Sequence, residues 1–196
     1  MTTDIPKHLQ ELLINVGLKI AKRGEGALFV VGEAKYKTLV SQSVKSFNVL
    51  KNPKLLESLA LMDGAVIISK KGKMIAYGAM IKSTRTLKNF GTRHSAALSA
   101  SENGNLAVVV SEEDKKVRII KDGKMVMQVD ALQKNVEQEV SNAVNLLESV
   151  GAGTVGALGT SLLVPGLGIT LLPGIVVFGS AYYLTKVLAG WWNKGR

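Results

Sequence analysis

Three short polar segments of this 196-residue chain carry the side chains best suited to chemistry, and each adjoins an apolar run. The segment 62–65 (MDGA) places the carboxylate of Asp63 before one run, and the segment 111–113 (SEE) places two carboxylates after another. The segment 91–97 (GTRHSAA) places a hydroxyl and a guanidinium at an expected helix start. Carboxylate oxygens suit Mg²⁺ or Mn²⁺ bridging phosphates, and helix starts and Arg side chains bind phosphate oxygens. The three segments together favour a nucleoside triphosphate site.

Each segment taken alone also has a simpler interpretation. Asp63 and Gly64 could form a plain turn, and Arg93 could pair with Glu102 on a helix surface. The residues 112–116 (EEDKK) could form a solvated hairpin loop. The nucleotide interpretation therefore depends on the three segments occurring together.

Composition excludes several other classes of site. The chain has no Cys, which excludes disulfides, Cys-zinc sites and thiol catalysis. Its two His residues, His8 and His94, are too few for a His-rich metal cage. No G-x-x-x-x-G-K-[ST] run is present, which excludes a P-loop NTPase, and nothing in the sequence announces partners for a Ser-His-Asp triad.

The formal charge of +10 is unevenly distributed along the chain. Residues 1–148 hold all 15 Asp and Glu and 22 of the 25 Lys and Arg, which gives +7, and the other three cations give the rest +3. A basic chain suits polyanionic partners. No basic stripe with interleaved aromatic residues is present, so a nucleic-acid partner is not expected.

The elements that must position these side chains alternate between helix and strand. Apolar spacing and turn signals predict helices at about 6–23, 53–61, 92–101 and 130–149, and strands at 27–32, 64–69, 74–78, 106–111, 116–120 and 124–128. Asp122-Gly123 is a strong hairpin signal between the last two strands. The sequence predicts an α/β fold with a central mixed sheet flanked by helices, within a domain of residues 1–149.

Residues 150–196 differ in composition and are predicted to form a hydrophobic helical hairpin. No charge occurs between Glu148 and Lys186, a stretch of 37 residues. At about 1.5 Å per residue this stretch is too long for one span of a hydrocarbon core of about 30 Å, so two helices are expected, at about 150–171 and 175–192. The turn would be Pro173-Gly174 or Pro165-Gly166. The basic residues near the end favour a membrane location with the first domain in the cytoplasm, and the alternative is a soluble hairpin packed on protein.

The polar segments and their flanks resemble the diadenylate cyclase (DAC) domain, which also forms the front of the DNA-integrity scanning proteins. The matching motifs are DGA at 63–65, GTRHxAA at 91–97 and SEE at 111–113, in the order typical of the family. The strand at 26–31 (GALFVV) and the hairpin at 72–78 also match. The resemblance covers roughly residues 10–128.

The resemblance implies a nucleotidyltransferase that condenses two ATP into the second messenger cyclic di-AMP, with release of two pyrophosphates and with Mn²⁺ or Mg²⁺. Two subunits would meet face to face as a homodimer, at least transiently. The catalytic residues would be Asp63, Arg93 and His94, and the metal ligands Asp63 with Glu112 or Glu113. The nucleotide-binding residues would be Gly64, Ala65, Gly78, Ala79, Gly91, Thr92, Arg93, His94, Ser95 and Ser111.

One departure concerns Ser95, because the family usually has a second Arg at that position. Reduced activity, compensation by Lys82 or Lys88, and a subfamily variation all remain open. The alternative function is a catalytically weak cyclase-like domain that binds ATP or cyclic di-AMP and signals through residues 150–192 at a membrane.

Overall fold

The structure is a computed structural model that describes residues 5–41, 44–83, 91–151, 169–172 and 174–177. Its helices are α1 (Lys7–Lys22), α2 (Pro53–Ala60), α3 (Thr92–Ala100) and α4 (Val136–Gly151). Its strands are β1 (Ala27–Val31), β2 (Tyr36–Thr38), β3 (Ala65–Ile68), β4 (Met74–Ile81), β5 (Leu106–Val110), β6 (Lys116–Lys121), β7 (Lys124–Asp130), β8 (Ile169–Leu172) and β9 (Ile175–Val177).

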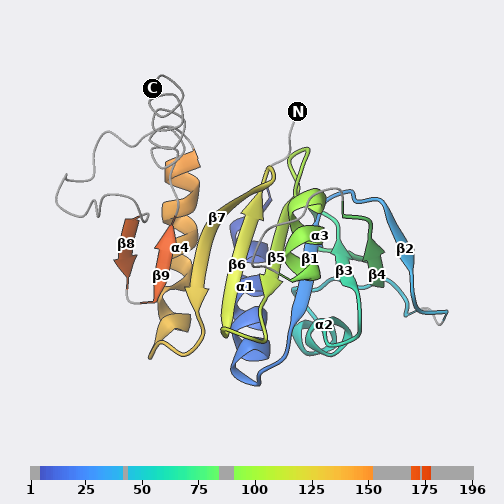
Figure 1. The fold of residues 1–196 in the computed structure, drawn as a ribbon, viewed down its shortest axis with the longest axis horizontal. Coiled ribbons are helices and arrows are strands. Elements are labelled where there is room, and N and C mark those ends of the chain that lie inside the picture. Colours follow the sequence, from blue (N-terminus) through green and yellow to red (C-terminus); the bar gives the residue numbers. More distant parts are fainter. Residues whose placement is uncertain (1–4, 42–43, 84–90, 152–168, 173, 178–196) are drawn as a thin grey trace, which may run out of the picture.

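All of these strands belong to one sheet with the order β2-β4-β3-β1-β5-β6-β7-β9-β8 (Figure 1). The pair β1 and β3 is parallel and the other neighbouring strands are antiparallel. The sheet is therefore mixed, as predicted. The starts of β1 and β3 and the ends of β4 and β5 consequently lie along the same edge of the sheet.

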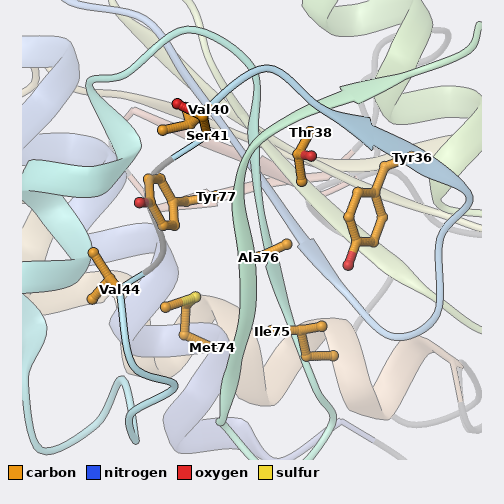
Figure 2. A pocket seen from close by; sticks show the side chains of 9 residues that line it. All are labelled: Tyr36, Thr38, Val40, Ser41, Val44, Met74, Ile75, Ala76 and Tyr77. Atoms are coloured by element: carbon orange, nitrogen blue, oxygen red, sulfur yellow. The ribbon is translucent and has the colours of Figure 1, made fainter.

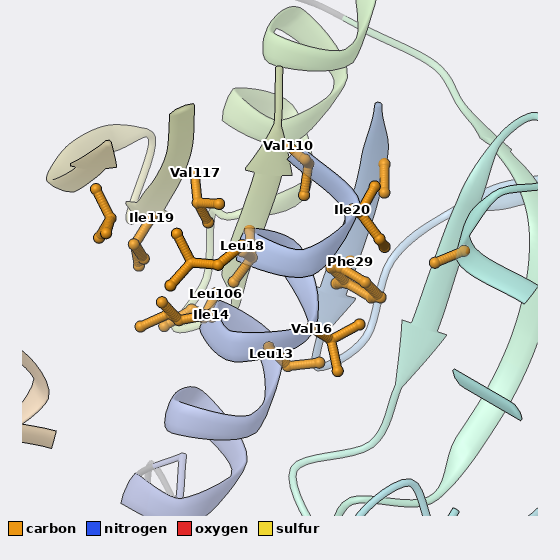
Figure 3. Close-up of a cluster of buried hydrophobic side chains, with 14 of the residues drawn as sticks. Leu13, Ile14, Val16, Leu18, Ile20, Phe29, Leu106, Val110, Val117 and Ile119 are labelled. Carbon is orange, nitrogen blue, oxygen red and sulfur yellow. The ribbon is translucent and has the colours of Figure 1, made fainter. Parts of the chain in front are cut away.

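Helices cover both faces of the sheet, because both faces of the central strands are apolar. In β1, Phe29 points into the core under α1, while Leu28 and Val30 point into the core under α3. Figure 3 shows the larger core, in which apolar side chains of α1 pack on Phe29 and on β5 and β6. Helices α1, α2 and α4 lie on this face and α3 lies on the other.

Helices α1 and α4 run antiparallel, and two ion pairs fix their relative direction. Lys7 pairs with Glu148 at 3.1 Å near one end, and Lys22 pairs with Glu137 near the other. Since β1 begins just after α1 ends, the last turn of α1 lies at the edge where β1 and β3 start. Residue 5 and the end of α4 lie at the opposite edge.

The helices and strands predicted between residues 6 and 128 are confirmed, but one strand in this range was not predicted and the last predicted helix begins later. Strand β2 lies in a Lys- and Ser-rich stretch that shows no strand pattern. Helix α4 begins at Val136 and not at 130, because Asp130 still belongs to β7 and accepts a hydrogen bond from the backbone N–H of Leu132 in a turn. The Asp122-Gly123 hairpin is confirmed, with positive φ at both residues.

The prediction of helices over 150–171 and 175–192 is wrong where the structure describes these residues beyond α4. Residues 169–172 and 175–177 form strands, and Gly174 between them has a φ of +79°. These residues are Ile, Thr, Leu and Val, which favour strands wherever an unpaired edge is available. Strand β7 offers that edge, and Ile175 and Val177 are each 1% exposed in the α1-side core.

The rest of the predicted hairpin, at 152–168 and 178–192, lies outside the described residues. Among the residues that are described, no helix has the length and apolar character needed to cross a bilayer. The predicted division at 149/150 falls inside α4, and β8 and β9 extend the sheet of the first predicted domain.

Candidate active site at the edge of the sheet

The starts of β1 and β3 and the end of β5 bring predicted site residues into one row. The register of β1 with parallel β3 and with antiparallel β5, continued to the strand ends, places Asp63 and Ser111 level with Gly26. Neighbouring strands lie about 4.8 Å apart, so Asp63 and Ser111 flank Gly26 and lie about 10 Å from each other. Two of the three polar segments therefore meet at one edge of the sheet.

The third segment reaches the same row through Arg93. Its Nη1 lies 3.4 Å from Oε2 of Glu112, and both side chains lie over Gly26. A Cβ at position 26 would come within 2.5 Å of Nη1 of Arg93 and 3.2 Å of Oε2 of Glu112. The pair is partly exposed, so its net contribution to stability is small, at about 0–1 kcal/mol. Arg93 and Glu112 are thus held together, yet they remain accessible to a ligand.

Asp63 is exposed beside the start of β3, where its Oδ1 accepts a hydrogen bond from the backbone N–H of Gly64 at 2.9 Å. Gly64 has a φ of +96°, and a Cβ there would lie 2.7 Å from the carbonyl carbon of Gly78. Only glycine therefore fits this turn, which brings the chain at Asp63 against the backbone of β4. The DGA motif thus has a structural reason for its glycine and leaves the carboxylate free to reach solvent.

Gly78 and Ala79 lie in β4 beside this turn. Ala79 pairs with Ala65 on one side and with Thr38 of β2 on the other, so both of its neighbours are strands. The carbonyl of Gly78 accepts a hydrogen bond from the backbone N–H of Leu39 at 2.8 Å. The predicted nucleotide-lining backbone at 64, 65, 78 and 79 is therefore contiguous across β3 and β4.

A surface hollow of about 280 Å³ lies farther along β4, between this strand and the segment from β2 to residue 44 (Figure 2). Tyr36 and Ile75 lie on one side of β4 in this view, and Met74 and Tyr77 lie on the other. Its nine lining residues include none of the predicted site residues. The hollow is therefore separate from the row at Gly26.

His94 lies just inside the first turn of α3 and is 6% exposed. Its Nε2 lies 3.2 Å from Nη1 of Arg118, a residue of β6 that is itself 5% exposed. The guanidinium of Arg118 also donates to both carboxylate oxygens of Asp114, and its Nε donates to Oε1 of Gln128 at 3.0 Å. The sequence analysis missed Arg118, Asp114 and Gln128.

This network shifts the pKa values of two of its members. Burial, and then the positive charges of Arg118 and Arg93, lower the pKa of His94 from 6.5 to about 4 against the opposing charge of Asp114. Partial burial raises the pKa of Asp114, but hydrogen bonds from Arg118 and Ser111 and the charges of Arg118 and Lys116 outweigh it, so that pKa is lowered overall. His94 is therefore neutral and Asp114 ionised at neutral pH.

The remaining predicted residues divide by exposure. Gly91 and Thr92 at the start of α3 are exposed, as are Glu112 and Glu113, whereas Ala65 and Ser95 are buried. Ser95, the position at which the family usually has an Arg, faces the interior beneath α3 at 6% exposed. Within the described ranges, no three Asp, Glu, His or Cys side chains gather closely enough to hold a metal ion.

Comparison with known proteins decides the family. A family model described as "DAC: DisA bacterial checkpoint controller nucleotide-binding" matches residues 17–125. The chain belongs to this DAC family. The resemblance inferred from the DGA, GTRHxAA and SEE motifs is therefore confirmed, and all three motifs fall within the matched residues.

Two curated relatives of this DAC chain are both named diadenylate cyclase. The relative from Methanocaldococcus jannaschii is 32% identical over 142 residues, which cover 63% of this chain and 46% of the relative. The relative from Haloferax volcanii is 30% identical over 138 residues, covering 60% of this chain and 51% of the relative. The chain thus spans about half the length of these relatives.

Two solved structures are also similar to the DAC chain. A DacA double mutant from Staphylococcus aureus is 26% identical, with a TM-score of 0.45, and the match covers 60% of this chain and 83% of that one. A hypothetical membrane spanning protein from Bacillus cereus is 29% identical, with a TM-score of 0.44, covering 58% and 60% of the two chains.

Proposed function

We propose that this DAC chain is a diadenylate cyclase, which condenses two ATP into cyclic di-AMP and releases two pyrophosphates. The observation that carries the proposal is the row at the sheet edge, where Asp63 and the Arg93–Glu112 pair flank Gly26. A carboxylate beside the start of β3 and a guanidinium from the first turn of α3 suit a phosphoryl transfer, which needs mainly positioning and neutralisation of charge.

In the proposed reaction two subunits face each other, each with one ATP. The 3′-hydroxyl oxygen of each ATP forms a bond to the α-phosphorus of the other, and the bond from that phosphorus to the bridging oxygen of pyrophosphate breaks. Asp63, exposed beside the row, accepts the proton of the hydroxyl. Arg93 and the backbone N–H groups at the start of α3 bind phosphate oxygens.

Mn²⁺ or Mg²⁺ fits the donor set only as an ion shared with the substrate. Asp63 and Glu112 supply hard carboxylate oxygens, and Glu113 is the neighbouring alternative to Glu112. Two carboxylates agree with the usual binding of Mg²⁺ by one or two carboxylates together with substrate phosphates. The bound ion would neutralise phosphate charge. Glu112 contacts Arg93 in the structure. When ATP and the metal ion bind, this contact would be replaced by one between Arg93 and phosphate and one between Glu112 and the metal ion.

The test is formation of cyclic di-AMP from ATP and Mn²⁺ by the purified full chain, followed by mass spectrometry. Asp63→Asn should abolish the product, because the amide cannot accept the proton. Gly26→Ala is the sharper variant, since its Cβ meets the flexible end of Arg93 and displaces it without a backbone clash. We expect Gly26→Ala to lower the rate about tenfold or more while the melting temperature changes little. Absence of product from the unmodified chain across metals and protein concentrations would overturn the proposal.

We also propose that the segments 152–168 and 178–192 attach the protein to a membrane, with the sheet and its site in the cytoplasm. The support is their sequence, in which Lys186 is the one charged residue. Attachment would raise the local concentration of subunits and favour the face-to-face encounter. Flotation of the full chain with liposomes tests this, and recovery of all the protein in the lipid-free fraction would contradict it.

A further inference from the structure

Arg118 is a buried charge in the centre of the sheet, and the proposed reaction does not account for it. It lies in β6 on the face covered by α3, the same face to which Ile120 points. Burying a guanidinium is costly, and well-packed apolar residues often replace a buried ion pair without loss of stability. A role in positioning the residues that it contacts, His94 and Asp114, would explain why an Arg occupies this buried position.

The guanidinium contacts two segments that end at the candidate site. Its Nη1 lies 3.2 Å from Nε2 of His94, the residue after Arg93. The same group binds Asp114, two residues after Glu112, through Nη1 at 3.2 Å and through Nη2. Arg118 therefore joins the first turn of α3 to the loop after β5, and these are the two segments that place Arg93 and Glu112 over Gly26.

The contact with His94 also specifies the state of the imidazole. A guanidinium has donors and no acceptor, so Nε2 of His94 must accept the hydrogen bond and cannot carry a proton. The remaining ring proton is then on Nδ1. Gln128, which accepts from Nε of Arg118 at 3.0 Å, holds the guanidinium from β7.

We propose that Arg118 is a positioning residue of the site, which clamps the first turn of α3 to the loop of residues 111–114 and fixes His94 as the Nδ1–H tautomer. The inference rests on the proposed function for the assignment of these two segments to ATP. Arg118 acts through His94 and Asp114 and is not a ligand of the substrate.

The kinetic test compares Arg118→Lys with the unmodified chain and with Arg23→Lys, a matched control. Arg23 also binds a carboxylate, that of Glu57 at 2.6 Å, and contacts neither His94 nor Asp114 in the hydrogen bonds and ion pairs of the described residues. Lysine keeps the positive charge but lacks the planar guanidinium, whose several N–H groups contact His94 and Asp114 at the same time. We expect Arg118→Lys to lower kcat about 10²-fold for each folded molecule, with the KM for ATP changed much less, because misplacement of about 1 Å has that effect. A kcat equal to that of Arg23→Lys would overturn the proposal.

A second measurement does not depend on catalysis. In ¹⁵N-histidine-labelled protein without ligand, the spectrum should show His94 with Nε2 unprotonated and Nδ1 protonated at neutral pH. The His8→Gln variant assigns the signals, since the chain has two His residues. In the Arg118→Lys variant, His94 should populate both tautomers, one with the proton on Nδ1 and one with the proton on Nε2. A proton on Nε2 of His94 in the unmodified chain would overturn the proposal even if cyclic di-AMP forms, and the expected tautomer would support it even if none forms.

Discussion

His94 shows at the scale of a single residue how burial changes the chemistry available to a site. An exposed His in a phosphate-binding segment would contribute a positive charge near its usual pKa. Here burial and two neighbouring Arg residues lower the pKa to about 4, so the imidazole stays neutral over the physiological range. In the proposed reaction the charge that faces phosphate is then that of Arg93, while His94 contacts Arg118 inside the protein.

The lowered pKa predicts a pH dependence of stability. The unfolded chain binds a proton at this residue near pH 6.5 and the folded chain only near pH 4, so the unfolded state binds more protons between these values. The stabilisation by neutral His94 is complete above pH 6.5 and is lost as the pH falls toward 4. We expect this residue to make the free energy of unfolding about 2 kcal/mol lower at pH 5 than at pH 7.5.

Urea denaturation at the two pH values checks this expectation. His94→Gln should lose most of the difference, whereas His8→Gln should retain it. The lowered pKa of Asp114 also makes the folded protein less stable as the pH falls. This loss occurs below the usual pKa of a carboxyl group, so it hardly changes the difference between pH 5 and pH 7.5. An equal pH dependence in the two variants would show that His94 is not the titrating group.

The sequence points to the candidate site residues that stand in motifs and gives little sign of Arg118, Asp114 and Gln128, which do not. Asp63, Arg93 and Glu112 stand in polar segments beside apolar runs, so their chemistry is visible in the sequence. Arg118 lies between the apolar residues Val117 and Ile119. This alternation is typical of a strand with one solvent-exposed face, and so it predicts that Arg118 points to solvent. The available signal was Ile120, whose apolar side chain on the same face indicates that this face is covered.

At the scale of the element, the hairpin of β3 and β4 depends on the approach of its two backbones at Gly64. We expect Gly64→Ala to destabilise the fold for two reasons, the φ of +96° and a Cβ only 2.7 Å from backbone carbon of Gly78. Gly72→Ala is the matched control, because its φ is +76° but the nearest atom would be 3.5 Å away. Backbone strain alone costs about 1–3 kcal/mol, so Gly64→Ala should lose clearly more than Gly72→Ala.

Chemical denaturation of the two glycine variants measures the difference. Equal losses would mean that the backbone contact at Gly64 relaxes without cost. Because Asp63 precedes this turn, Gly64→Ala should also lower the proposed cyclase activity at temperatures where the variant remains folded, and Gly72→Ala should not.

Elements with local signals were predictable, whereas elements that depend on distant partners were not. The Asp122-Gly123 turn and the apolar stripe of α1 need no knowledge of the rest of the chain. Strands β8 and β9 form because β7 presents an unpaired edge, and an apolar run gives no sign of that edge. Strand β2 is held in the same way by its pairing with the end of β4.

At the scale of the whole molecule, β9 protects one side of the sheet. Ile175 and Val177 are buried against the α1-side core, and β9 pairs along β7. We expect a chain ending at residue 151 to be less stable than one ending at 177 by about 3 kcal/mol or more, since each buried side chain contributes about 1.5–3 kcal/mol. The shorter chain should also self-associate through the exposed edge of β7.

Thermal unfolding and size-exclusion chromatography of the two truncated chains check this. The same pair isolates the contribution of residues 152–177, because both chains lack residues 178–196. Identical melting temperatures would show that β9 adds nothing to the sheet, and a monomeric shorter chain would contradict the expected association through β7.

The antiparallel packing of α1 on α4 also determines how the molecule can be presented to others. Residue 5, the end of α4 and the end of β9 all lie toward the sheet edge opposite Asp63 and Arg93 (Figure 1). A protein tethered to a bead at residue 5 would therefore display the edge that holds Asp63 and Arg93 outward. If the proposed face-to-face reaction holds, tethered copies spaced too far apart to meet would form no cyclic di-AMP by themselves, and free copies added in solution would start its formation.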